Sequence, residues 1–147
     1  MGSEMFRGTR RGAVYESVAR YGPTEQDAVA ADVRISSERV ADGVVVVSVV
    51  GEIDMHAAST LRALLRRADE ARTAVVVVDM TATTFIDSTT LAILVGAARR
   101  SQQRDGELRI ACVDRNITRI FELMLLDRLF AIYSSRTAAL DALPRIR

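Results

Sequence analysis

The sequence predicts an α/β fold: a mixed, mostly parallel β-sheet flanked by α-helices, with a two-stranded hairpin at its N-terminal side. Short valine-rich segments alternate with longer segments whose apolar residues recur at helical spacing, an order typical of parallel sheets. An Asp-Gly pair at residues 42–43 separates the first two strand-like segments, as in a tight hairpin turn. Hydrophobic residues make up 49% of the 147 residues, which is enough to bury one core.

The predicted hairpin joins two different kinds of strand. Val33, Ile35 and Ser37 alternate with polar neighbours, which indicates a strand that is buried on one face only. Val44–Val50 is almost entirely valine, a pattern typical of a strand covered on both faces.

A first helix is predicted after residue 54, and a second strand and helix follow it. The helical positions of the first helix are Ala58, Leu61, Leu65 and Ala68. Asp54 can cap its N-terminus. Val75–Val78 predicts the next strand, which we expect to end at Asp79. The second helix is expected to run from a cap at Asp87 or Ser88 to about residue 104.

The C-terminal third predicts two more strand-and-helix units. We expect a strand over residues 108–112 and, after a cap at Asn116, a helix whose core side chains are Ile117, Ile120, Phe121 and Met124. Met124, with Leu125 and Leu126, could instead form an exposed apolar edge for a partner. A short strand at 130–133 and a helix capped by Ser134 or Ser135 complete the fold before Pro144.

The chain divides into an N-terminal extension and one domain. Residues 1–31 are rich in Gly and Arg and lack a sustained apolar stripe, so we expect a flexible extension. Within it, Val14, Val18 and Tyr21 could form a short amphipathic helix. The extension could order on a partner or support a homodimer. Residues 32–147 form the predicted α/β domain.

Composition excludes several functional classes. The 20 basic and 19 acidic residues leave a net charge of +1, which argues against direct nucleic-acid binding. Every basic residue is Arg, and the absence of Lys excludes P-loop NTPases, protein kinases and Schiff-base enzymes. No apolar run is long enough to cross a membrane, and no signal peptide is evident, so we expect a cytoplasmic protein.

The single cysteine and the single histidine limit the chemistry further. Cys112 cannot form an internal disulfide, and on a strand it is expected to be a small core residue. His56 alone cannot build a multi-histidine zinc site, and an exposed or capping position is expected for it.

Three aspartates follow predicted strands and allow an enzymatic interpretation. Asp54, Asp79 and Asp87 could hold Mg²⁺ or act as acid and base at the carboxyl edge of the sheet. Asp79 could also resemble a phospho-acceptor, but that chemistry uses a lysine. The simpler interpretation is that these acids cap helices and end strands. Without a lysine or a glycine-rich phosphate loop, the metal-dependent enzyme is the weakest hypothesis.

The segment Asp87-Ser88-Thr89-Thr90 carries more hydroxyls than helix capping needs. At a helix N-terminus a phosphate is favoured by the helix dipole, but here it would face Asp87 and Asp54. Such a surface changes its character when it is modified. The segment supplies no general base, metal cluster or oxyanion donors, so we expect no catalytic residues, no metal and no cofactor.

These residues resemble the STAS family, the domain of bacterial anti-sigma-factor antagonists. The resemblance rests on the valine strand followed by Gly51-Glu52-Ile53-Asp54, on Val75–Asp79 and on Phe85-Ile86-Asp87-Ser88-Thr89. Residues 123–130 (LMLLDRLF) are similar to the family's segment before the last strand. The match spans about residues 32 to 143.

The resemblance implies a switch at the turn that follows Asp87. In such antagonists the second hydroxyl residue after this aspartate is phosphorylated by the partner anti-sigma factor, an ATP-dependent serine/threonine kinase. That residue is Thr89, with Ser88 as the fallback acceptor. Asp54, Asp87, Ser88 and Thr90 are then expected to line the partner surface. The unphosphorylated antagonist holds the anti-sigma factor and frees the sigma factor, and a protein phosphatase reverses the modification.

Thr90 leaves a second interpretation open. The family often has Gly directly after the acceptor, and a β-branched residue narrows the approach of a kinase backbone. The domain could therefore be a scaffold or adaptor subunit that is never phosphorylated.

Overall fold

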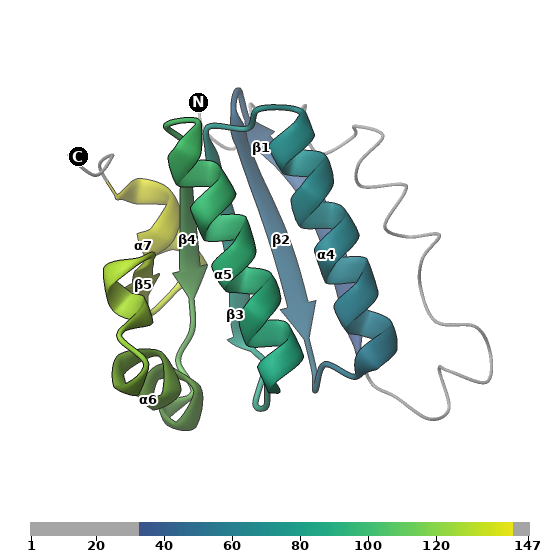
Figure 1. The fold of residues 1–147 in the computed structure, drawn as a ribbon, viewed down its shortest axis with the longest axis vertical. Helices are drawn as coiled ribbons and strands as arrows, with labels where there is room; N and C mark the ends of the chain where they lie inside the picture. The colour runs from purple at the N-terminus through teal and green to yellow at the C-terminus, as the bar shows by residue number, and fades with distance from the viewer. Residues whose placement is uncertain (1–32, 143–147) are drawn as a thin grey trace.

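The computed structural model describes residues 33–142, which fold around one five-stranded sheet (Figure 1). The strands lie across the sheet in chain order: β1 (Arg34–Ala41), β2 (Val44–Val50), β3 (Val75–Ala82), β4 (Glu107–Ala111) and β5 (Ala131–Tyr133). β1 pairs with β2 antiparallel, and every later neighbour is parallel. The predicted mixed sheet with an N-terminal hairpin is confirmed.

Two long helices cover one face of the sheet. α4 (Met55–Glu70) and α5 (Ser88–Gln103) lie side by side on it (Figure 1). Successive parallel strands are added in one direction, so right-handed crossovers place both connecting helices on the same face. α6 (Arg115–Leu123) and the 3₁₀ turn η1 (Leu126–Arg128) lead from β4 to β5. The short helix α7 (Arg136–Asp141) packs on the opposite face, against β3 and β4.

The valine strands supply core to both faces. In β2, Val45, Val47 and Val49 belong to the cluster under α4 and α5, whereas Val46 belongs to the smaller cluster with Ala139 of α7. β3 alternates in the same way. Burial on both faces explains why these strands lack the polar alternation of β1.

The structure corrects three details of the expected elements. β3 continues to Ala82, so Asp79 lies inside the strand and does not end it. α6 is capped by Asp114, whose Oδ1 accepts from the backbone N–H groups of Asn116 (2.9 Å) and Ile117 (3.1 Å); Asn116 lies inside the helix and is not the cap. Met124 is not a core residue, because it follows the last residue of α6 and is 57% exposed.

Some predictions concern residues outside the described range. The extension over residues 1–31 and the short helix carrying Val14, Val18 and Tyr21 lie there, and so does Pro144. Within residues 33–142, no helix is long and apolar enough to cross a membrane.

A buried ion pair ties α7 to the sheet. On β4, Arg109 Nε donates to Glu107 Oε2 at 3.1 Å, and both side chains are buried. Arg109 Nη1 also donates to the carbonyl oxygen of Ala139 in α7, at 2.7 Å. One guanidinium therefore neutralises a buried carboxylate and fixes the C-terminal helix.

Arg109→Leu should lower the free energy of unfolding by about 3–5 kcal/mol, because it leaves the Glu107 carboxylate buried without a partner. The double variant Glu107→Leu/Arg109→Leu should recover most of this loss. Urea denaturation of the three proteins measures the difference. Equal destabilisation by the single and double variants would show that the ion pair is not what the single substitution disrupts.

Candidate functional site

Three helices begin at the edge of the sheet where β2, β3 and β4 end, at the lower end of Figure 1. Each begins with an aspartate N-cap: Asp54 for α4, Asp87 for α5 and Asp114 for α6. The caps follow from the topology, because the free N–H groups of a helix N-terminus need an acceptor where the chain leaves the sheet.

The loops before α4 and α5 are held together. The backbone N–H of Gly51 donates to the Ala82 carbonyl at 3.0 Å. The hydroxyl of the buried Thr83 donates to the Val49 carbonyl, also at 3.0 Å. These bonds join the loop that carries Asp54 to the loop that leads to Asp87, so the two predicted acids belong to one surface.

The start of α5 is built on Asp87 and Thr90. Asp87 Oδ1 accepts from the backbone N–H of Thr90 at 2.9 Å and from its hydroxyl at 3.0 Å. The backbone N–H of Thr90 is the main cause that lowers the pKa of Asp87. Partial burial opposes this shift, and the Thr90 hydroxyl adds to it. Asp87 is therefore ionised at neutral pH.

The three consecutive hydroxyl residues do not share one environment. Thr90 is fully buried and supports the turn from inside. Ser88 and Thr89 are exposed in the first turn of α5, and within residues 33–142 neither hydroxyl makes a hydrogen bond. Of the three hydroxyl residues, only Ser88 and Thr89 are therefore accessible to a kinase or a binding partner. The buried side chain of Thr90 is not accessible.

Asp54 is exposed, and its Oδ1 accepts from the backbone N–H of Ala57 at 2.8 Å. Asp79 lies apart from the caps: its Oδ1 accepts from the backbone N–H and the hydroxyl of Thr81, at 3.0 and 2.7 Å. In the described part of the chain, no three Asp, Glu, His or Cys residues are grouped so that they could hold a metal ion. Asp54 and Asp87 therefore cap separate helices, Asp79 bonds to Thr81 within β3, and the three acids do not form the hypothetical Mg²⁺ cluster.

Large apolar side chains that no sequence pattern marked as a surface are exposed on the same edge. Met55 is 77% exposed at the start of α4, and Phe85 is 52% exposed in the loop before α5. Val113 is exposed directly before the cap of α6. The available signal was their position, since each stands within two residues of an aspartate cap.

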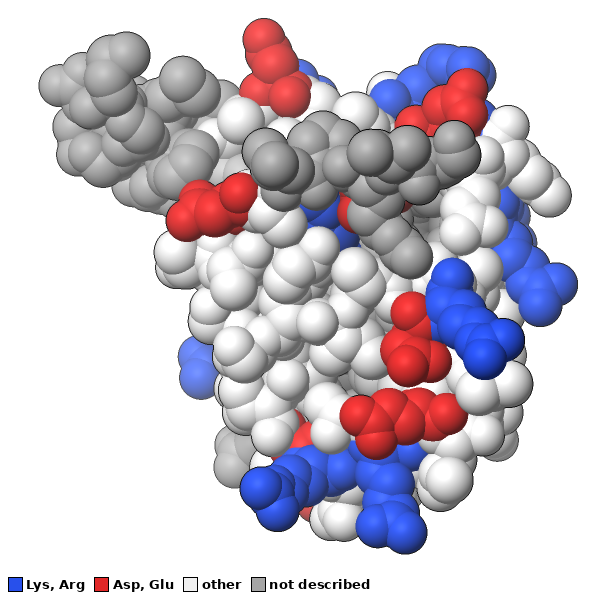
Figure 2. Space-filling model, turned by 90° about the vertical axis from the view of Figure 1, so that its left-hand side faces the viewer, with Lys and Arg blue, Asp and Glu red and all other residues white. Residues whose placement is uncertain are grey.

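A second apolar group lies at the end of α6. It comprises Leu123, Met124 and Leu125, all of which are exposed, whereas Leu126 is partly buried against the core. Figure 2 views the side of the molecule with β5, α6 and α7, where a broad area without charged side chains is bordered by arginine and acidic groups. The predicted apolar edge therefore exists, with Leu123 in place of Leu126.

The remaining candidates have ordinary environments. Cys112 is buried, as expected of a core residue, and burial raises the pKa of its thiol. His56 is exposed in the first turn of α4.

Thr90→Val should destabilise the protein by about 0.5–1.5 kcal/mol at neutral pH, because it removes the hydroxyl bond to Asp87. The loss should shrink as the pH falls through the lowered pKa of Asp87, since the bond stabilises the ionised carboxylate. Thermal denaturation between pH 3 and pH 7 measures this. Thr89→Val removes a hydroxyl that has no hydrogen bond to any other described residue. It is the matched control and should change stability by less than about 0.5 kcal/mol.

Comparisons with known proteins identify relatives of this chain. The chain is 26% identical over 102 residues to the anti-sigma F factor antagonist of Paenibacillus polymyxa, an alignment that covers 69% of this chain and 87% of the relative. It is 32% identical over 75 residues to the anti-sigma-B factor antagonist of Listeria monocytogenes, covering 51% of this chain and 66% of the relative.

A solved structure shares the fold. The crystal structure of an anti-sigma factor antagonist from Mycobacterium paratuberculosis superposes with a TM-score of 0.66 at 29% identity, covering 74% of this chain and 92% of that chain. The sequence profile of the STAS domain matches residues 37–139, from β1 to α7. The chain therefore belongs to the STAS domain family.

Proposed function

We propose that this STAS domain is an anti-sigma-factor antagonist of the cytoplasm that is switched by phosphorylation of Thr89. In the unphosphorylated state it binds an anti-sigma factor of the ATP-dependent serine/threonine kinase type, and the sigma factor is released. Phosphorylation ends the complex, and a protein phosphatase restores it. The observation that carries the proposal is the Thr89 hydroxyl, which is exposed and makes no hydrogen bond within residues 33–142. The next residue, Thr90, is buried and bonded to the Asp87 cap. The domain itself is not an enzyme in this scheme.

The edge combines the features of a partner-binding surface. Met55 and Phe85 supply exposed apolar area, and the helix caps Asp54 and Asp87 supply negative charge at the same edge. Aromatic and methionine side chains are enriched in protein interfaces, and acidic groups select a partner with basic groups. The similarity to curated antagonists supports an anti-sigma factor as that partner.

Phosphorylation would alter this surface by charge. A phosphate adds about −1.5 to −2 charges at the first turn of α5. The helix dipole favours it there, but the ionised Asp87 stands at the preceding cap. An interface that covers Thr89 would then enclose like charges, and the complex becomes less stable. Couplings of about 1–3 kcal/mol change affinity by roughly 5- to 150-fold, enough to exchange partners.

Thr89→Glu should weaken the complex by at least about fivefold, whereas Thr89→Ala should bind and resist phosphorylation. The proteins are compared as baits in a pull-down from a lysate of the source bacterium, read by mass spectrometry, and affinity is then measured with the purified partner. Thr137→Glu adds the same charge on exposed α7 and is the matched control. Equal binding of the Thr89→Glu variant and the wild type would exclude the switch.

The acceptor is identified by incubating the captured kinase and ATP with wild type, Thr89→Ala and Ser88→Ala. Loss of phosphate in Thr89→Ala alone assigns Thr89, and loss in Ser88→Ala alone assigns the fallback. If neither residue is phosphorylated and every variant retains the same protein that is not a kinase, the domain is an adaptor subunit.

Phe85→Ala should reduce partner affinity by roughly tenfold or more, because it removes an exposed aromatic anchor at the proposed interface. Stability should change little, since about half of the ring is in solvent. Titration calorimetry with the purified partner and a thermal melt separate the two effects. Phe85→Leu retains most of the apolar area and should bind better than Phe85→Ala; an unchanged affinity in both variants would place Phe85 outside the interface.

A further inference from the structure

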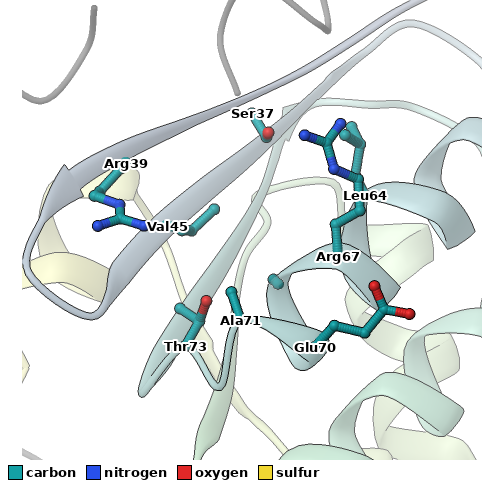
Figure 3. Close-up of a pocket in the computed structure, with 9 residues that line it drawn as sticks. Ser37, Arg39, Val45, Leu64, Arg67, Glu70, Ala71 and Thr73 are labelled. Carbon is teal, nitrogen blue, oxygen red and sulfur yellow. The ribbon is translucent and has the colours of Figure 1, made fainter. Parts of the chain in front are cut away.

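A cavity of about 350 Å³ lies between β1 and the C-terminal half of α4 (Figure 3). The side chains that line it are Ser37, Arg39, Val45, Leu64, Arg67, Ala68, Glu70, Ala71 and Thr73. This volume is at the lower end of the range for small-molecule sites, about 300–1,000 Å³. Because α4 starts at the Asp54 edge and the cavity adjoins its last turns, the two sites lie at opposite ends of the helix.

Two residues with hydroxyl groups are buried in the wall of the cavity. Ser37 is 3% exposed and Thr73 is 6% exposed, and both line the cavity. Among residues 33–142, no donor or acceptor is hydrogen-bonded to either side-chain hydroxyl. Neither oxygen is among the fully enclosed, unpartnered side-chain atoms of the described residues, so both hydroxyls stay accessible and can donate to a group that enters the cavity.

Two arginines stand on opposite sides of the same space. Figure 3 shows Arg39 on the strand side and Arg67 on the helix side. Neither guanidinium forms an ion pair with any other described residue. Glu70 is the acid among the lining residues, and its carboxylate points away from the others in Figure 3. The cavity therefore carries net positive charge beside an aliphatic wall of Val45, Leu64 and Ala68.

We propose that this cavity binds a small organic anion. A carboxylate or a phosphate monoester carries the negative charge of this ligand, and the rest of the ligand is apolar. The planar guanidinium groups of Arg39 and Arg67 match the oxygens of either head group. The hydroxyls of Ser37 and Thr73 donate to oxygens that reach further in, and the apolar body packs on the aliphatic wall. The site is separate from the Thr89 surface and does not depend on its function.

The test is a titration of the full chain, followed by the backbone amide signals of the ¹⁵N-labelled protein. The anionic probes are hexanoate, benzoate and phenyl phosphate, and the neutral matches are hexanamide and benzamide. The signals of Ser37, Val45 and Thr73 should shift and saturate with the anions, and the amides should bind at least about tenfold more weakly. The relative affinities of benzoate and phenyl phosphate decide which head group is preferred. Comparing inorganic phosphate with phenyl phosphate measures how much the apolar body contributes to binding.

Substitutions then locate the site. Arg39→Gln and Arg67→Gln should each weaken the best probe by roughly tenfold. Ala71 is an exposed residue in the wall of the cavity. Ala71→Leu should narrow the cavity and also weaken binding of the probe. The matched controls are Arg34→Gln on the same strand and Arg66→Gln on the same helix; neither residue lines the cavity. The amide spectra of the variants report whether each one is folded.

Three results would overturn the proposal. The first is the absence of saturable shifts with every anion. The second is equal binding of the neutral amides, and the third is an equal loss of affinity in the Arg34→Gln and Arg66→Gln controls. If inorganic phosphate bound as tightly as phenyl phosphate, the apolar body would contribute nothing to binding, and that part of the proposal would be wrong.

Discussion

The Asp87 carboxylate organises the surface on which the proposed function depends. One of its oxygens accepts from both the backbone N–H and the hydroxyl of Thr90, and this fixes the first turn of α5. The turn then presents Ser88 and Thr89 outward on a helix N-terminus. Without this double acceptance, the adjacent hydroxyls would compete for the same cap, and their exposure would not be defined.

The aspartates at the edge where β2, β3 and β4 end are a consequence of the parallel arrangement of these strands. Successive strands end at the same side, and each following helix requires an acceptor for its free N–H groups. Asp54, Asp87 and Asp114 meet that requirement, so three negative charges stand along one edge for structural reasons. A phosphate at Thr89 would join charges that are already fixed there, and a moderate change of charge could therefore reverse binding.

Much of this architecture was predictable because it rests on local signals. The valine runs, the Asp-Gly turn and the helical periodicity each report a period or a turn that one segment determines. The capping positions were less certain, since Asp114 and Asn116 are both good caps and only the observed hydrogen bonds distinguish them. Burial at the start of α5 was not predictable either: Ser88, Thr89 and Thr90 are chemically similar, and which of them is buried depends on where α5 meets the sheet.

Other features depend on contacts between distant segments. The cavity beside α4 forms because Arg39 of β1 and Arg67 of α4 lie on opposite sides of one space (Figure 3). No local sequence pattern predicts that arrangement. In the same way, the exposure of Met124 follows from the end of α6 at Leu123, whereas helical spacing alone placed Met124 in the core.

At this edge, the residues that hold the helices differ from the residues that project into solvent. This separation affects how the sequences of such domains can diverge. Asp54, Asp87 and Thr90 hold helices in place, so a change there is felt by folding as well as by recognition. Met55, Phe85 and Val113 project into solvent beside them and contribute little to the core. Under the proposed function, partner preference can therefore change at the second group of positions while the first stays constant. Duplicated copies in one cell could then bind different partners and keep a common fold.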